Sequence, residues 1–159
     1  MAEGERLTRG AIINELGVAS RYAHELAFAG LREAGVEPDE YGWVSFVAVL
    51  EPVTRTKLTQ ATGQRRTTVR DAIRRMVERG HVEEVPHPQD GRSTLLRLTP
   101  SGRELFDTGQ PVVVRVLEAI DKALGGTLDE HEEAVWRVRL ALQELVGDGE
   151  PAGIEAARV

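Results

Sequence analysis

The sequence of 159 residues predicts a mainly α-helical protein with one small β-hairpin. Two observations carry this prediction. Apolar residues recur at helical spacing over most of the chain. The stretch Val82–Leu98 differs, because the polar segment PQDGRS separates two apolar runs there. Asp90-Gly91 in that segment predicts a tight hairpin turn, since type I′ turns need positive φ at both central residues.

Two helices are predicted before residue 52. Helical periodicity with a single apolar stripe extends from about Glu5 to Ala34, and Gly35 follows it. A second helix begins at Pro38, because proline fits the first turn of a helix and the acidic residues after it are favourable at the positive end of the helix dipole. We expect this helix to end before Pro52.

The middle of the chain predicts a compact series of short elements. A short helix spans Thr54–Thr62, Gly63 supplies a turn, and a second helix spans Gln64–Arg79 with apolar residues on one face. Gly80 lies where a C-terminal helix cap is expected, and the hairpin follows. A short helix, a glycine-containing turn, a second helix and a β-hairpin form a winged helix-turn-helix. We place this unit within residues 38–100.

Two more helices are predicted after the hairpin. One begins at Thr99 and extends beyond Pro111, which should kink or interrupt it. The other begins at a capping box that opens at Thr127, and it ends at Gly147. We expect residues 148–159 to form a disordered tail.

Composition limits the classes of function. Apolar residues make up 41% of the chain, which is enough for a core, and there is no cysteine, which excludes disulfides, thiolate metal sites and thiol redox sensing. No apolar run resembles a signal peptide or a membrane span, so we expect a soluble cytoplasmic protein. The sequence also contains no phosphate-binding loop, no dinucleotide fingerprint and no metal-ligand spacing, and we expect neither an enzyme nor a cofactor.

Charge is distributed unevenly along the chain. The net charge is −6, but residues 53–103 contain eleven Lys and Arg against five Asp and Glu, a local charge of +6 that leaves −12 for the remainder. A basic middle between acidic flanks is typical of a module that binds a polyanion within a solubilising scaffold.

The second helix of the helix-turn-helix carries most of this positive charge. Such a helix enters the major groove of DNA, where arginine and threonine can contact bases and phosphates. Its only acids are Asp71 and Glu78, so we expect its exposed face not to be neutralised by ion pairs. For any single arginine, a base contact, a phosphate contact and no contact stay open. Arg92, at the tip of the hairpin, is placed to enter a narrow minor groove.

At these residues the chain resembles the MarR (multiple-antibiotic-resistance regulator) family. The resemblance covers roughly Leu7 to Val146 and rests on three landmarks: Thr67-Thr68-Val69 at the start of the recognition helix, Glu78-Arg79-Gly80 at its end, and Asp90-x-Arg92 followed by Leu98-Thr-x-x-Gly102. The chain departs from the family pattern at Gln64, where an apolar turn residue is usual, and at Gly91, where arginine is commoner.

The resemblance implies a homodimer that binds double-stranded DNA at pseudo-palindromic operators. It implies a helical dimerisation region, here 5–35 and 101–146, and often a repressor released by a small anionic or phenolic effector. Carried over, the recognition-helix contacts are Arg65, Arg66, Thr67, Thr68, Arg70 and Arg74, and the wing contacts are Arg92 and Ser93. The first two helices line the effector pocket in this family, which points to Tyr22, His24, Trp43 and Phe46.

Alternatives stay open at this point. Core or dimer packing is the competing interpretation of Trp43 and Phe46. A winged-helix module that binds a protein rather than specific DNA is the competing function, and activation is the competing mode of regulation.

Overall fold

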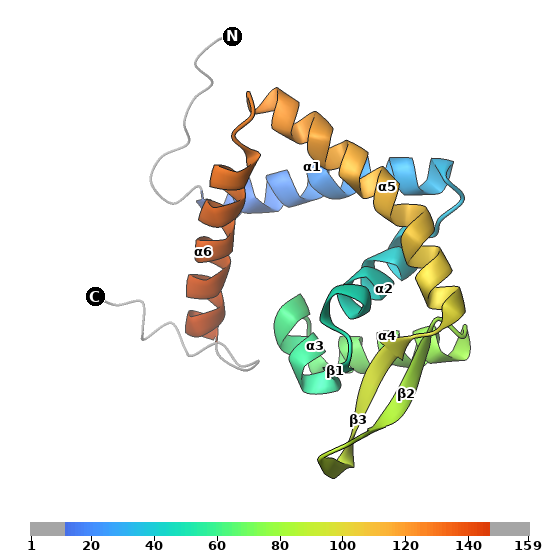
Figure 1. The fold of residues 1–159 in the computed structure, drawn as a ribbon. Coiled ribbons are helices and arrows are strands. Elements are labelled where there is room, and N and C mark those ends of the chain that lie inside the picture. The colour runs from blue at the N-terminus through green and yellow to red at the C-terminus, as the bar shows by residue number, and fades with distance from the viewer. Residues whose placement is uncertain (1–11, 147–159) are drawn as a thin grey trace.

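The computed structural model describes residues 12–146, and within them it contains six helices and a three-stranded antiparallel sheet (Figure 1). The predicted mainly helical fold with a small wing is therefore confirmed. The first residues of the predicted N-terminal helix, 5–11, and the predicted tail, 148–159, lie outside the described residues. The elements in chain order are α1 (Ile12–Glu33), α2 (Pro38–Leu50), β1 (Val53–Thr54), α3 (Arg55–Thr62), α4 (Arg66–Glu78), β2 (Val82–His87), β3 (Asp90–Leu98), α5 (Pro100–Ala123) and α6 (Leu128–Val146).

The helix-turn-helix forms as predicted, with each helix end fixed locally. Thr54 caps α3 by accepting a hydrogen bond from the Lys57 N–H at 3.2 Å. Gly63 then adopts the left-handed conformation at φ 64°, which turns the chain into α4. The apolar face of α4 is buried, and Gly80 at φ 74° follows its C-terminus.

The sheet contains one strand that sequence reasoning missed. The strand order is β1-β3-β2, and Val53 in β1 pairs with Leu96 in β3. β1 has two residues, which is too short to show the alternation by which a strand is found in a sequence. Its pairing ties the chain before the helix-turn-helix to the base of the wing.

The turn of the wing is not where the sequence predicted it. Asp90 belongs to β3 and pairs with His87, so the turn residues are Pro88 and Gln89, and Gly91 does not have positive φ. The Asp90 carboxylate accepts hydrogen bonds from the Arg92 N–H and the Ser93 hydroxyl, an Asx-type turn that bends the chain after Asp90. Because the next pair joins Pro86 to Thr94, residues 91–93 form a bulge in β3.

Two clusters of buried residues hold the fold together. The larger one lies between α2, α3, α4 and the sheet and includes Val44, Leu58 and Leu96, all fully buried. The smaller one joins α1, α2 and α5 through Leu31, Val36, Tyr41 and Val112. α5 is not interrupted at Pro111, which is exposed and lies directly before Val112 in this second cluster.

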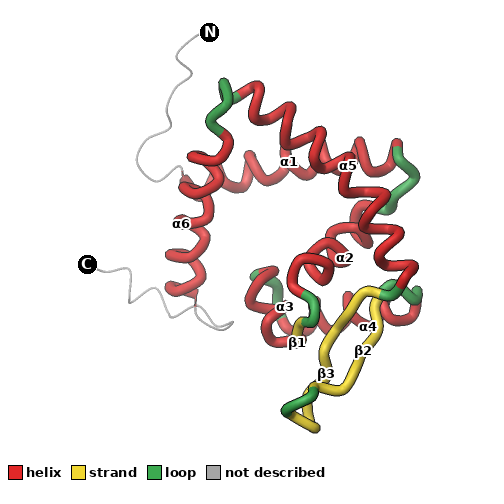
Figure 2. The backbone as a smooth tube through the Cα atoms, in the orientation of Figure 1, coloured by secondary structure: helices red, strands yellow, loops and turns green. Residues whose placement is uncertain are grey.

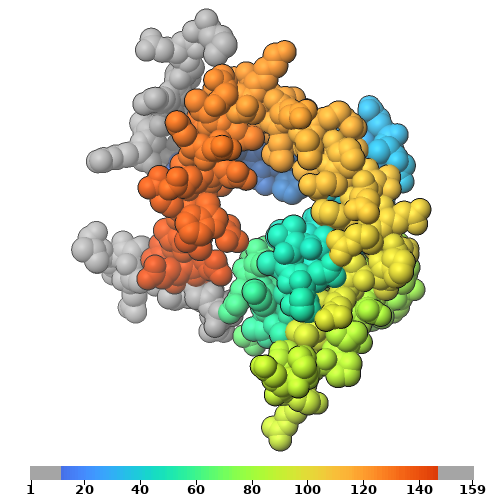
Figure 3. All heavy atoms as spheres, viewed as in Figure 1, coloured from blue at the N-terminus to red at the C-terminus, as the bar shows by residue number. Residues whose placement is uncertain are grey.

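The long helices frame the winged-helix unit. α5 leaves the wing, runs beside α1, and turns back into α6, whose far end reaches α3 (Figure 2). The space-filling view shows an opening enclosed by α6, by α1 and α5, and by the winged-helix unit (Figure 3). No residue of α6 is buried. Among the described helices, none combines the length and apolar character that crossing a membrane requires.

Candidate nucleic-acid interface

The N-terminal half of α4 presents its polar residues to solvent. All six residues predicted to contact DNA from this helix are exposed, namely Arg65, Arg66, Thr67, Thr68, Arg70 and Arg74. Arg65 occupies the N-cap position and its side chain makes no capping hydrogen bond. The first-turn N–H groups, the positive end of the helix dipole and two arginines therefore coincide at one exposed point, which favours an anion such as a DNA phosphate.

Ion pairs engage Arg70 and Arg74 of α4 and leave its other arginines that face solvent without a carboxylate partner on this helix. Asp71 Oδ1 lies 3.7 Å from Arg70 Nε and 3.6 Å from the Arg74 guanidinium, and Glu78 lies 3.9 Å from Arg74 Nε. The expectation that this face would carry no mutual ion pairs was therefore wrong for Arg70 and Arg74, because Asp71 lies between them. Exposed pairs of this kind are weak, so a phosphate can replace them. Arg65 and Arg66, at the start of the helix, form no ion pair with any described residue, and neither does the exposed Arg75 near its end.

The wing holds Arg92 through its backbone and leaves the side chain free. Asp90 accepts hydrogen bonds from the Ser93 hydroxyl at 2.5 Å and from the Arg92 N–H at 3.0 Å. The Ser93 hydrogen bond, the Arg92 N–H and the nearby His87 together lower the pKa of Asp90. Arg92 is exposed within the bulge, while the half-buried Ser93 directs its hydroxyl proton to Asp90.

Both predicted DNA-contacting elements lie at the same end of the molecule. α3, α4 and the β2–β3 hairpin occupy the end opposite α1 and the second half of α5 (Figure 1). The structure thus places the exposed arginines of α4 and Arg92 of the wing on one module, built around the larger core cluster.

The four residues predicted to line an effector pocket lie on α1 and α2. Tyr22 and His24 are exposed on α1, where the His24 ring packs edge-to-face on Phe28 with centroids 5.5 Å apart. Trp43 packs against the larger core cluster, and Phe46 is 42% exposed. Trp43 therefore has a packing contact, and the effector role of all four stays a prediction.

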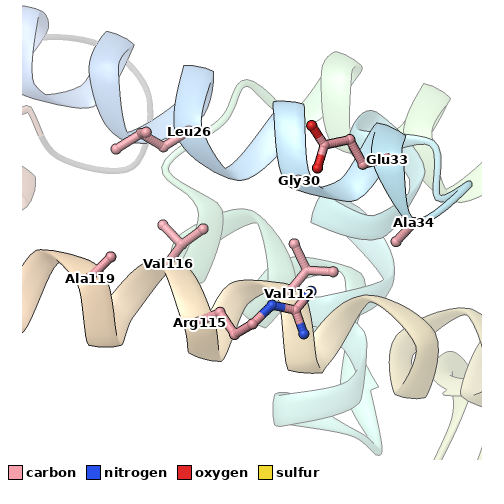
Figure 4. Close-up of a pocket in the computed structure, with 8 residues that line it drawn as sticks. All are labelled: Leu26, Gly30, Glu33, Ala34, Val112, Arg115, Val116 and Ala119. Carbon is pink, nitrogen blue, oxygen red and sulfur yellow. The ribbon is translucent and has the colours of Figure 1, made fainter.

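A groove that sequence reasoning did not single out lies between α1 and α5. It has a volume of about 440 Å³ and is lined by Leu26, Gly30, Glu33, Ala34, Val112, Arg115, Val116 and Ala119 (Figure 4). A Cβ atom at Gly30 would lie 2.7 Å from Val112 Cγ1, so this glycine allows the two helices to approach closely. Within the described residues, no group of three His, Asp or Glu side chains is placed to hold a metal ion.

Comparison with known proteins places these features in a family context. Residues 34–93 match the model of the MarR family, and no curated protein matches the sequence. The fold is similar to that of apo MarR from E. coli, with a TM-score of 0.62, 17% identity, and coverage of 81% of this chain and 96% of that one. It is similar to S. aureus MepR in a complex with DNA, with a TM-score of 0.68, 15% identity, and coverage of 82% and 96%. It is also similar to the PcaV transcriptional regulator of Streptomyces coelicolor in complex with its natural ligand, with a TM-score of 0.62, 22% identity, and coverage of 82% and 91%.

Proposed function

We propose that this chain, which carries a MarR-family winged helix-turn-helix in residues 34–93 and the fold of that family's solved regulators, is a homodimeric repressor of transcription. It binds pseudo-palindromic operator DNA and is released by a small anionic or phenolic effector. The observation that carries the proposal is the coincidence, on one module, of the unpaired arginines at the start of α4 and the exposed Arg92 of the wing.

DNA contact follows from this geometry. The N-terminal half of α4 enters the major groove, where Arg65, Arg66 or Arg70 can bond guanine or phosphate, and Thr67 and Thr68 can contact bases. Arg92 reaches the adjacent minor groove. The likeness to a DNA complex of MepR supports this arrangement. In a dimer the two α4 helices would read half-sites roughly 34–36 Å apart.

Dimerisation is supported by large apolar side chains that the described residues of one chain leave about half exposed. On α6, Trp136 is 52% exposed and Leu145 57% exposed, and on α1, Tyr22 is 55% exposed and Leu26 56% exposed. Monomeric proteins rarely expose large apolar patches. These helices belong to the segments 12–35 and 101–146, which we assign as the described part of the dimerisation region. Sedimentation equilibrium tests this assignment, and a monomer at micromolar concentration would contradict it.

An effector is supported by neighbours that were solved with ligands, including S. aureus MarR in complex with salicylate and kanamycin and PcaV with its natural ligand. We assign Tyr22, His24, Trp43 and Phe46 as the candidate lining. A screen of salicylate and related benzoates and phenols for release of bound DNA tests this step, with Phe46→Ala as the variant expected to lose the response.

Selection of bound sequences from a random DNA pool tests the function itself. We expect enrichment of a palindrome, steep loss of affinity with rising salt because phosphate contacts release counterions, and weaker binding by Arg66→Ala in a mobility-shift titration. Arg137→Ala, an exposed arginine on α6, is the matched control and should leave affinity unchanged. Absence of any enriched sequence would instead favour a winged-helix module that binds protein.

A further inference from the structure

We infer that Glu40 and Glu51, at the two ends of α2, are positioning residues that set the recognition helix and the wing at the spacing that DNA requires. Glu40 holds the C-terminal end of α4, and Glu51 holds the base of the wing. This inference rests on the proposed DNA-binding function, and it assigns separate roles to two carboxylates that do not themselves face DNA.

Glu40 lies where three elements converge. Its carboxylate forms an ion pair with Arg79, the C-cap residue of α4, and its Oε2 lies 3.5 Å from Nε2 of His81. Glu40 and His81 keep only 19% and 17% of their side chains exposed. His81 in turn accepts the Thr99 N–H on its carbonyl at 3.1 Å, and its Nδ1 lies 3.2 Å from the Ser101 hydroxyl. The partly buried Glu40 carboxylate thus fixes the end of the recognition helix to α2, and His81 links the same point to the start of α5.

Glu51 holds the base of the wing in the way that Glu40 holds the end of α4. Its Oε2 accepts the backbone N–H of Leu98, the last residue of β3, at 2.7 Å, and its Oε1 pairs with Arg103 of α5. The side chain of Glu51 is only 17% exposed. β1 begins two residues later and pairs with β3 beside this point. Glu51 therefore fixes where β3 ends and α5 begins, and that junction sets the direction in which the wing leaves the module.

α2 is built to serve as a rigid link between these two points. Val44 and Val47 are fully buried in the larger core cluster. Tyr41 donates a hydrogen bond to Gln110 of α5 at 3.0 Å and stacks on Phe106 with centroids 6.2 Å apart. Glu51, the C-cap residue of α2, follows Glu40 by eleven positions, or about 16 Å at 1.5 Å per residue. Asp39, the other acid in the first turn, is exposed and has no ion pair among the described residues.

The consequence concerns simultaneous binding. The α4 arginines and Arg92 contribute together only if helix and wing reach their two grooves at the same time. Removing one carboxylate releases one element and leaves the other in place. Each carboxylate should therefore be energetically coupled to the DNA contacts of its own element and not to those of the other.

Double-mutant cycles on the full-length protein test this, with Kd measured by fluorescence anisotropy on the selected operator. Glu51→Gln and Glu40→Gln keep the side-chain shape, and Asp39→Asn and the exposed Glu104→Gln are matched controls. In the Glu51→Gln background we expect Arg92→Ala to weaken binding at least about threefold less than it does in the wild type, whereas Arg66→Ala keeps its full effect, since interacting sites are non-additive and independent sites are additive. Glu40→Gln should show the reverse pattern.

The outcomes separate this inference from the proposed function. Absence of saturable operator binding by the wild type would overturn the proposed function. Binding that Arg66→Ala and Arg92→Ala weaken, combined with additive cycles for both glutamates, would overturn the positioning role alone. A merely structural role would lower the melting temperature and reduce the effects of Arg66→Ala and Arg92→Ala equally. The controls should leave every cycle unchanged.

Discussion

The winged-helix unit and α6, the last helix of the frame, differ in how far their apolar residues are buried. In the winged-helix unit, Leu58 and Leu96 are completely buried within a single chain. In the frame, α6 has no buried residue although its sequence is also amphipathic. Amphipathic helices therefore build a closed core in the winged-helix unit, whereas on α6 the apolar side chains of the described chain stay about half exposed.

This difference identifies where each region obtains its stability. The winged-helix unit closes its core with α2, α3, α4 and a sheet that is paired on both sides of β3. α6 touches the rest of the chain through polar contacts such as those of Arg139 and Gln143 to carbonyls of α3. In the proposed dimer, a second copy would supply apolar packing for α6.

The largest expected effect is in the core of the winged-helix unit. Leu96→Ala removes a fully buried side chain at the centre of the sheet, and it should lower the free energy of unfolding by about 2–5 kcal/mol. Chemical denaturation at two protein concentrations measures this loss. A loss below 1 kcal/mol would mean that the core can collapse into the cavity, and the contrast between the regions would weaken.

The frame should respond to a change of similar chemistry in a different way. Trp136→Ala on α6 should weaken dimerisation by about 2–4 kcal/mol, as expected for a large aromatic residue at an interface. The melting temperature should then depend more strongly on protein concentration than it does in the wild type. Sedimentation equilibrium gives the dimer constant, with the exposed Glu132→Gln as control. If the wild-type protein were a monomer and Trp136→Ala left its melting temperature unchanged, α6 would be only a solvated helix.

The sequence predicted the helices well because their signals are local. Pro38 begins α2, and Gly63 and Gly80 adopt the left-handed conformations expected of them next to α3 and α4. The winged helix-turn-helix followed from the order of these elements. The exposure of the predicted DNA-contacting residues also followed from helical periodicity, because that property depends on the face of α4 alone.

Features that depend on competition between interactions were not predictable in this way. Asp90-Gly91 predicted a turn, but the chain turns at Pro88 and Gln89. The Asp90 side chain accepts hydrogen bonds from residues 92 and 93, which lie beyond that turn. Periodicity likewise cannot show that Asp71 lies between Arg70 and Arg74 in space. The groove between α1 and α5 requires knowledge of how two distant helices cross, which no local pattern contains.

The start of α5 joins the winged-helix unit to the frame, and adding a side chain there tests how tightly this junction is packed. A Cβ at Gly102, at the start of α5, would lie 2.0 Å from the carbonyl oxygen of His81. Gly102→Ala should therefore lower the free energy of unfolding by about 1–3 kcal/mol. Gly42→Ala is the matched control, because a Cβ at this position inside α2 meets nothing within 4 Å, and it should stabilise the protein by about 0.5–1 kcal/mol. Thermal denaturation that gave both changes the same sign would show that the junction is loosely packed.

The smallest expected effect is at the tip of the wing, which is stabilised by local hydrogen bonds and not by burial. The Ser93 hydroxyl and the Arg92 N–H stabilise the Asp90 carboxylate and lower its pKa. Because the folded-state pKa lies below the unfolded one, this stabilisation is complete above the unfolded pKa and is lost as the pH falls through the folded one. NMR titration of the Asp90 carboxyl should thus give a pKa below the ordinary value of about 3.9, and Ser93→Ala should raise it. The melting temperature at neutral pH should change little in Ser93→Ala, since the tip adds nothing to the buried core. An ordinary pKa for Asp90 in the wild type would mean that the bulge carrying Arg92 is not held by this carboxylate, and that the wing depends on DNA to become ordered at its tip.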